Sequence, residues 1–238
     1  MNIPFGFIAA CIAGAVVLAL FLYERTKNGP GAKAVILKAQ VSILFLAAWG
    51  IAALSRGMDA YSLFVGGGLA FGLLGDIWLD LKFACRDGEE DTFTVMGFTS
   101  FAVGHILYVA ASAFGVKEFK ITAALPALGV ALAAGCAVYF GEKLMKLTYG
   151  KYKMISTLYA ALMFFMTSFA LFSSLFGGIA DNKRVFTLFI GGVFFIISDL
   201  ILSGTYFGEG KNRPVDIVTN HVTYYIAQYI IAATLLAA

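Results

Sequence analysis

The chain has 238 residues, of which 61% are hydrophobic and 13% are charged, and its mean hydropathy is +0.87. Soluble globular domains carry about twice that share of charged residues, so the composition excludes an ordinary soluble domain and indicates an integral membrane protein. The formal net charge of +3 requires no nucleic-acid partner, because the basic residues fall in segments that flank apolar runs.

Apolar windows long enough to cross a bilayer recur along the whole chain. A spanning helix needs about 20 mostly apolar residues, and breaks marked by charged residues, Gly or Pro separate the windows. The windows lie at 5–23, 34–54, 60–80, 94–114, 121–141, 155–176, 185–206 and 216–237. About eight such helices leave no room for a soluble domain. We therefore expect an all-α, polytopic membrane helix bundle that forms one integral-membrane domain over residues 1–238.

The first window could instead be a signal peptide, because Ile8–Cys11 resembles a lipoprotein cleavage site. No Lys or Arg precedes it, and the apolar stretch before Cys11 is short, so a membrane helix is favoured. Cys85 and Cys136 add neither a metal-ligand spacing nor a Cys-x-x-Cys motif. We expect the cysteines to be packing residues, and we expect no metal and no cofactor.

The distribution of Lys and Arg predicts the orientation of the chain. The first, third, fifth and seventh loops, with the adjoining helix ends, hold 12 basic residues, and the even-numbered loops hold 5. Basic loops stay on the cytoplasmic side of a membrane. We therefore expect a multi-pass protein of a bacterial inner membrane or its equivalent, with both termini outside the cytoplasm.

Two aspartates lie inside apolar windows, Asp76 within Gly72–Asp80 and Asp199 within Phe194–Ser203. A carboxylate at membrane depth costs several kcal/mol, and such residues usually face a bundle interior or a wet cavity and serve function. The alternative is that each caps a helix end or forms a hydrogen bond to a neighbouring helix. The pair is the first candidate for a catalytic site.

Other polar side chains fall at similar depths, in the half of the bundle predicted to face the cytoplasm. The candidate residues, from five predicted helices, are Lys38, Asp76, Asp80, His105, Tyr108, Asp199, Asn220, His221, Tyr224, Tyr225 and Gln228. Asp76 and Asp80 are one turn apart and share a helix face. This clustering predicts a single polar pocket that opens toward the cytoplasm. Lys38 could instead extend to the membrane interface, and His105 could be an interhelical hydrogen-bond partner.

Glycines are concentrated before Asp76, in Gly66-Gly67-Gly68 and at Gly72 and Gly75. Small residues at this spacing favour close packing of membrane helices. No Gly-Lys-Ser or Gly-Lys-Thr follows them, so they do not indicate a phosphate-binding loop. We expect the helix over 60–80 to be central in the bundle.

Four motifs resemble those of a known family. They are Leu-Gly-Asp-Ile-Trp-Leu at 74–79, Phe-x-x-Gly-His-Ile-Leu-Tyr at 101–108, Phe-Ile-Ile-Ser-Asp-Leu at 195–200 and Tyr-Tyr-Ile-Ala-Gln-Tyr at 224–229. With Lys38, and in this order, they make the chain resemble the YhhN-like lysoplasmalogenase family of integral membrane proteins. The resemblance covers nearly the whole chain. It implies hydrolysis of the vinyl-ether bond of lysoplasmalogens to a fatty aldehyde and a glycerophospho-alcohol, with a lysophospholipid and membrane lipid as partners.

The buried acids suit that chemistry. A vinyl ether is hydrolysed when its carbon is protonated and water captures the oxocarbenium ion, which requires one protonated carboxyl group and a second, ionised one. Asp76 and Asp199 could divide these roles, and the deeper Asp199 is the slightly better acid. Lys38 could meet the substrate phosphate. The remaining polar residues of the predicted pocket could bind substrate or orient the carboxyl groups and water.

Other functional classes fit the sequence less well. No His-Glu-x-x-His pair and no Gly-x-Ser-x-Gly motif is present. A proton-coupled transporter could use Asp76 and Asp199 as a relay. However, the window at 155–176 and the outer halves of 60–80 and 185–206 have few polar residues to line a path. A receptor or scaffold would leave the buried acids unexplained.

Overall fold

A computed structural model describes residues 3–210 and 212–237, and within these ranges the chain is helical, without a named strand. The long helices are α1 (Phe5–Lys27), α2 (Ala32–Arg56), α3 (Ala60–Leu81), α4 (Glu90–Gly115), α5 (Ala124–Phe140), α7 (Lys153–Phe176), α8 (Lys183–Phe207) and α9 (Pro214–Ala233); α6 (Glu142–Met145) is one short turn. The predicted helix bundle is confirmed, and the eight predicted windows correspond to the eight long helices.

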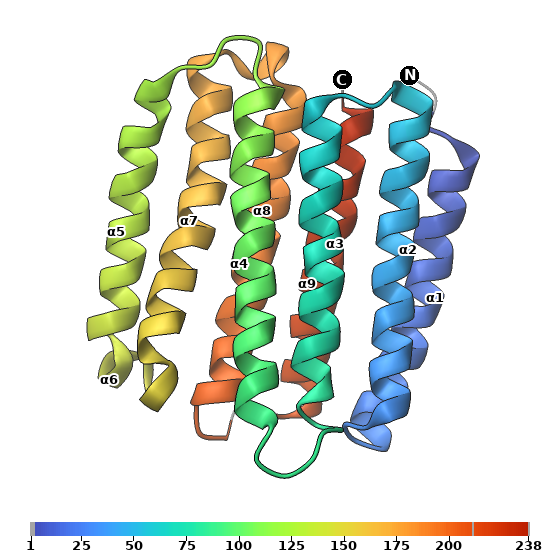
Figure 1. The fold of residues 1–238 in the computed structure, drawn as a ribbon, viewed down its shortest axis with the longest axis vertical. Coiled ribbons are helices and arrows are strands. Elements are labelled where there is room, and N and C mark those ends of the chain that lie inside the picture. Colours follow the sequence, from blue (N-terminus) through green and yellow to red (C-terminus); the bar gives the residue numbers. More distant parts are fainter. Residues whose placement is uncertain (1–2, 211, 238) are drawn as a thin grey trace.

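Seven of the long helices are apolar and long enough to cross a membrane. The exception among the described elements is α9, which carries the stripe of Asn220, Tyr224 and Gln228. Helix α9 nevertheless runs through the bundle beside the other long helices (Figure 1). The two chain ends lie on the same side of the bundle. The lower hydropathy of α9 follows from its polar face, which points into the protein, where all three of these side chains are buried.

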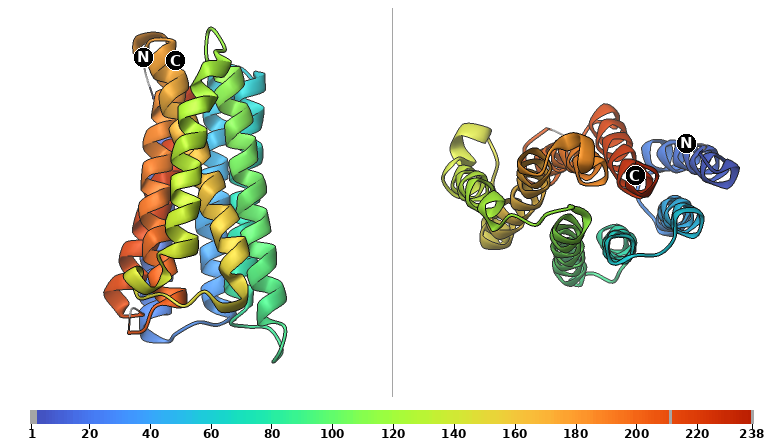
Figure 2. Two further views of the ribbon diagram at one scale, coloured as in Figure 1. Left: turned by 90° about the vertical axis from the view of Figure 1, so that its left-hand side faces the viewer. Right: turned by 90° about the horizontal axis from the view of Figure 1, so that it is seen from above.

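The helices lie in two rows, as seen from above in Figure 2. Helices α2, α3 and α4 form one row, and α1, α9 and α8 form the other, with α7 next to α4 and α8 and with α5 outside α7. Helix α3 contacts α2, α4 and α9. The expectation that the glycine-rich helix is central is therefore consistent with its place in the middle of one row and against α9 of the other.

Glycine positions on α3 face aromatic rings of neighbouring helices. A Cβ atom at Gly66 would lie 2.1 Å from the Trp49 ring, and one at Gly68 would lie 2.2 Å from the Tyr108 ring. Real Cβ contacts are never this short, so the rings occupy the space that a side chain would need. Close packing of α3 against α2 and α4 thus depends on these glycines.

The loops at the end opposite the termini position residues around the entrance to the bundle. Thr148 N donates to the carbonyl of Phe207 at 2.8 Å, and Leu147 pairs with Gly208 in an isolated bridge, so the segment before α7 is joined to the end of α8. This end contains the loops that sequence analysis predicts to be cytoplasmic. Of the basic residues in that prediction, Lys211 lies outside the described residues.

Substitution Gly68→Ala should destabilise the bundle by about 1–3 kcal/mol, the usual cost of overpacking a core, because the new methyl group overlaps the Tyr108 ring. The matched control is Gly50→Ala on α2, where a Cβ meets no atom within 4 Å. Thermal unfolding in detergent measures both. Equal unfolding temperatures for the two variants would contradict the packing role of Gly68.

The topology prediction is that both termini lie outside the cytoplasm and that the loop containing Lys143 and Lys151 lies inside. Its basis is the excess of basic residues at one end of the bundle. Reporter fusions after the last residue and within the loop measure it. A cytoplasmic C-terminus would invert the orientation.

Candidate functional site

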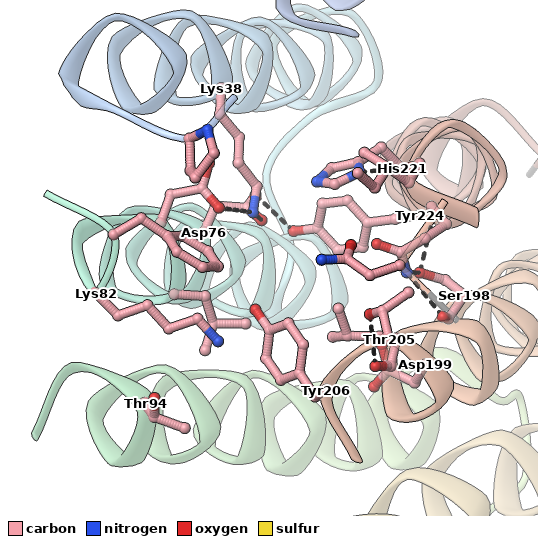
Figure 3. Close-up of a pocket in the computed structure, with 18 of the residues that line it drawn as sticks. Lys38, Asp76, Lys82, Thr94, Ser198, Asp199, Thr205, Tyr206, His221 and Tyr224 are labelled. Atoms are coloured by element: carbon pink, nitrogen blue, oxygen red, sulfur yellow. Dashed lines mark hydrogen bonds and ion pairs between the residues drawn. The ribbon is translucent and has the colours of Figure 1, made fainter. Parts of the chain in front are cut away.

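A cavity of about 460 Å³ lies in the half of the bundle away from the termini. Pro30, Phe83 and Asn212, from three loops at that end, belong to its wall, so the cavity reaches the loops. Seven of the eleven candidate residues line it: Lys38, Asp76, Asp80, Asp199, Asn220, His221 and Tyr224. Figure 3 shows Asp76 and Lys38 on one side and Asp199 on the other.

Asp76 accepts hydrogen bonds from side chains of two other helices. Its Oδ2 atom is 2.7 Å from both the Ser42 hydroxyl and the Tyr224 hydroxyl, and its Oδ1 atom is 3.4 Å from Lys38 Nζ. A carboxylate that receives two hydroxyl donors and faces an ammonium group is stabilised in its ionised form. The contact brings α2, α3 and α9 together at one point.

Lys38 lies between two carboxylates, with its Nζ atom 3.1 Å from Asp80 Oδ1 in addition to its contact with Asp76. All three side chains are buried, and Lys38 is 6% exposed, so it does not extend to the membrane interface. One ammonium group cannot neutralise two carboxylates. The second oxygen of Asp80, Oδ2, is buried and has no hydrogen-bond partner among the described residues. If both carboxylates are ionised, this trio carries a net negative charge.

Asp199 has a different environment. Its Oδ2 atom accepts a hydrogen bond of 2.7 Å from the Tyr159 hydroxyl, and no ion pair of Asp199 occurs within the described part of the chain. The Tyr159 oxygen lies 3.2 Å from His105 Nε2. Because the Tyr159 proton goes to Asp199, its oxygen accepts from His105, whose Nε2 therefore carries the proton. The result is a chain from His105 through Tyr159 to Asp199.

Tyr159 was missed by sequence analysis. The window at 155–176 was described there as poor in polar residues, and tyrosine counts as hydrophobic in the composition. The available signal was that Tyr159 lies near the predicted cytoplasmic end of its helix, at the same depth as the other candidate groups. The structure shows that this helix, α7, supplies the one hydroxyl group that contacts Asp199 among the described residues.

The other four candidates, His105, Tyr108, Tyr225 and Gln228, are buried beside the cavity rather than in its wall. The Tyr225 hydroxyl is 3.2 Å from Ser42 Oγ and donates to the Lys38 carbonyl at 3.2 Å. The Tyr108 hydroxyl donates to Gln228 Oε1 across 3.5 Å. Tyr225 thus contacts groups that hold Asp76, whereas the pair of Tyr108 and Gln228 links α4 to α9.

Two residues of α9 are held by backbone atoms. Asn220 Nδ2 donates to the Ser198 carbonyl at 2.8 Å, which fixes α9 beside the residue preceding Asp199. His221 Nδ1 is 2.8 Å from the Ile217 carbonyl. Since a carbonyl oxygen can only accept, Nδ1 carries the proton, and Nε2 of the neutral ring is left as an acceptor.

Aromatic rings pack in and behind one side of the cavity wall, next to these polar groups. The rings of Phe101, Phe195 and Tyr224 make edge contacts with one another, with centroids 5.5 to 6.0 Å apart, and His105 packs on Phe195 at 4.8 Å. The surroundings of Asp76 and Asp199 are therefore apolar beyond their hydrogen-bond partners. Electrostatic interactions are stronger in such a setting than in water.

Two further cations, Arg25 and Lys82, line the cavity. Sequence analysis counted them only among the basic residues of the loops. Lys82 Nζ lies 3.3 Å from the centre of the Tyr206 ring, which also belongs to the wall. Their side chains could have been placed at a site only by knowing that the ends of α1, α3 and α8 lie around the same cavity. No group of three His, Cys, Asp or Glu side chains suited to a metal ion occurs in the described ranges.

Chemically, two of the carboxyl groups in the cavity wall, Asp76 and Asp199, have unequal partners. Asp76 receives an ammonium group and two hydroxyl groups, whereas Asp199 receives one phenol. Such inequality is the arrangement in which one carboxyl group donates a proton and another stabilises positive charge.

Comparison with known proteins agrees with the motifs. The model of the YhhN family matches residues 7–235, nearly the whole chain. No curated protein and no solved structure matches the chain. Because the match includes all the long helices from α2 to α9 and most of α1, the chain belongs to the YhhN family.

Proposed function

We propose that the protein is a lysoplasmalogenase-type hydrolase that cleaves the vinyl-ether bond of a lysoplasmalogen to a fatty aldehyde and a glycerophospho-alcohol. The observation that carries the proposal is that Asp76 and Asp199 line one cavity with unequal partners. Membership of the YhhN family supports a lysoplasmalogenase-like hydrolase of the membrane.

In the proposed reaction, Asp199 gives its proton to the vinyl carbon that is not bonded to oxygen. The neighbouring carbon becomes part of an oxocarbenium ion, and water adds to it with loss of a proton. The resulting hemiacetal then breaks its bond to the glycerol oxygen, which takes up a proton and leaves as the alcohol, while the aldehyde forms. The proton released by water restores Asp199. No net proton is consumed, and one water is used for each bond cleaved.

Asp199 is assigned as the acid because its surroundings tolerate a neutral carboxyl group. Tyr159 can donate to Oδ2 of a protonated carboxyl group, and Oδ1 then carries the proton. Asp76 is assigned as the ionised group because three donors face it, and it would stabilise the cation across the cavity. His105 is a positioning residue that acts through Tyr159.

A proton-coupled transporter is less well supported. A permeation path needs polar lining toward both membrane surfaces, but the cavity lies in the half of the bundle away from the termini. Tyr108 and Gln228, which lie nearer the termini, are hydrogen-bonded to each other and are not part of its wall. Between Asp76 and the end that carries the termini, α3 presents Gly72, Gly68 and Val65; the Tyr108 ring packs against Gly68, and Gln228 packs against Gly72. No observation favours transport over hydrolysis.

Variants Asp76→Asn and Asp199→Asn should each lower kcat by at least about 100-fold, the usual contribution of a positioned acid or base, while the protein stays folded. Aldehyde release from a lysoplasmalogen by the purified protein measures this. The matched control is Asp87→Asn in the exposed loop between α3 and α4, which should keep full activity. Near-normal turnover in either the Asp76 or the Asp199 variant would remove that residue from the mechanism.

Single-chain vinyl-ether lipids should be strongly preferred over two-chain plasmalogens, because a second chain would displace the polar groups or water that the cation requires. The saturated ether analogue should not be cleaved, since it cannot form the oxocarbenium ion by protonation, and it should inhibit competitively. Rates and inhibition constants for the three lipids measure this. Comparable turnover of the two-chain lipid would contradict a single-chain pocket, and cleavage of the saturated ether would contradict the protonation step.

A further inference from the structure

Two cations of the cavity wall form no ion pair with any carboxylate of the described residues. Arg25 lies in the last turn of α1, and Lys82 follows the last residue of α3. Neither side chain forms an ion pair or donates a hydrogen bond within the described residues. By contrast, Lys38 is engaged by Asp76 and Asp80. The free positive charge of the cavity is therefore carried by Arg25 and Lys82.

Aromatic rings hold these two side chains. The Arg25 guanidinium lies 4.3 Å from the centre of the Phe83 ring, and Lys82 Nζ lies 4.8 Å from the same ring. Lys82 also lies over Tyr206, as Figure 3 shows. Contacts with ring faces orient a cation but leave its N–H groups free to donate elsewhere. Both charges are thus preorganised beside Phe83, which belongs to the loop end of the cavity.

The charge on Lys82 is costly without an anion nearby. Burial and the positive charges of Lys38 and Arg25 together lower the pKa of Lys82 to about 7, and Asp80 offsets them only in part. The other carboxylate of the wall at this end, Glu90, is exposed and accepts a hydrogen bond from Gly88 N at 3.0 Å. An anion placed between Arg25 and Lys82 would stabilise the charged form of the lysine.

We infer that Arg25 and Lys82, rather than Lys38, bind the phosphate group of a lysophospholipid at the loop end of the cavity. The inference rests on the proposed function, because it places the headgroup of the same substrate. A guanidinium group can bind two phosphate oxygens at once, and an ammonium group adds a point charge. The phosphate then stays at the loop end while the vinyl ether reaches Asp76 and Asp199 deeper in the bundle.

The experiment measures binding of a saturated ether lysophospholipid and of a 1-O-alkylglycerol with the same chain but no phosphate. In Lys82→Gln and in Arg25→Gln, the dissociation constant of the phospholipid should rise about tenfold or more, as expected for loss of a hydrogen bond between charged groups. Binding of the alkylglycerol should be unchanged. The control is Lys27→Gln, an exposed residue of the same helix as Arg25, which should bind both lipids as the unmodified protein does.

Two checks separate phosphate recognition from a structural role. Lys82→Arg should retain most of the phospholipid affinity, because it keeps the positive charge. Weakened binding of both lipids in Lys82→Gln would overturn the inference, as would unchanged binding of the phospholipid. Inorganic phosphate should compete weakly with the phospholipid in the unmodified protein and not in Lys82→Gln. Inorganic phosphate that binds as tightly as the lipid would show that free phosphate is the ligand, and would also overturn it.

The binding assay is independent of hydrolysis, so the two proposals fail separately. Phosphate-dependent binding without aldehyde release from any vinyl-ether lysophospholipid would overturn the hydrolase proposal and support the phosphate site. Aldehyde release with unchanged phospholipid binding in Arg25→Gln and Lys82→Gln would overturn the phosphate site and support the hydrolase proposal.

Discussion

Asp76 lies in the interior of a membrane helix bundle, and an ionised carboxylate there is tolerated only if other groups compensate for the lost water. Its ion-pair partner Lys38 and its hydrogen-bond donors Ser42 and Tyr224 come from α2 and α9. Those two helices must therefore meet α3 at one level. The glycine one turn earlier makes this possible, since a Cβ at Gly72 would lie 3.0 Å from a side-chain atom of α9. The packing of α3 and the ionisation of Asp76 depend on the same contact.

The charges of the cavity are unevenly distributed. Lys38 serves Asp76 and Asp80 together, so the deeper region holds more negative than positive groups, whereas Arg25 and Lys82 leave the loop end positive. An anionic headgroup at the entrance and a cationic transition state farther inside would each meet opposite charge. This arrangement supports the proposal that Arg25 and Lys82, rather than Lys38, bind the phosphate group.

Much of the architecture could be predicted from hydropathy and residue type. A helix that crosses a membrane must be long and apolar, so its position can be predicted from a single stretch of sequence. Buried acids are rare enough that Asp76 and Asp199 could be identified without a structure. Tyr159 could not, because tyrosine is common in membrane helices and nothing local distinguishes one that faces an aspartate. Arg25 and Lys82 could not, because basic residues are also expected at cytoplasmic helix ends.

The sequence by itself determined the long apolar helices and the presence of two acids within them, because these depend on composition over about 20 residues. Only the tertiary structure decided which groups share an environment. In the tertiary structure Lys38 pairs with two carboxylates, and the Tyr159 hydroxyl donates a hydrogen bond to Asp199. His105 and Gln228 lie behind the cavity wall. The physical reason is that protonation and charge depend on distances of a few ångströms between different helices, and the spacing of residues along one helix does not contain those distances.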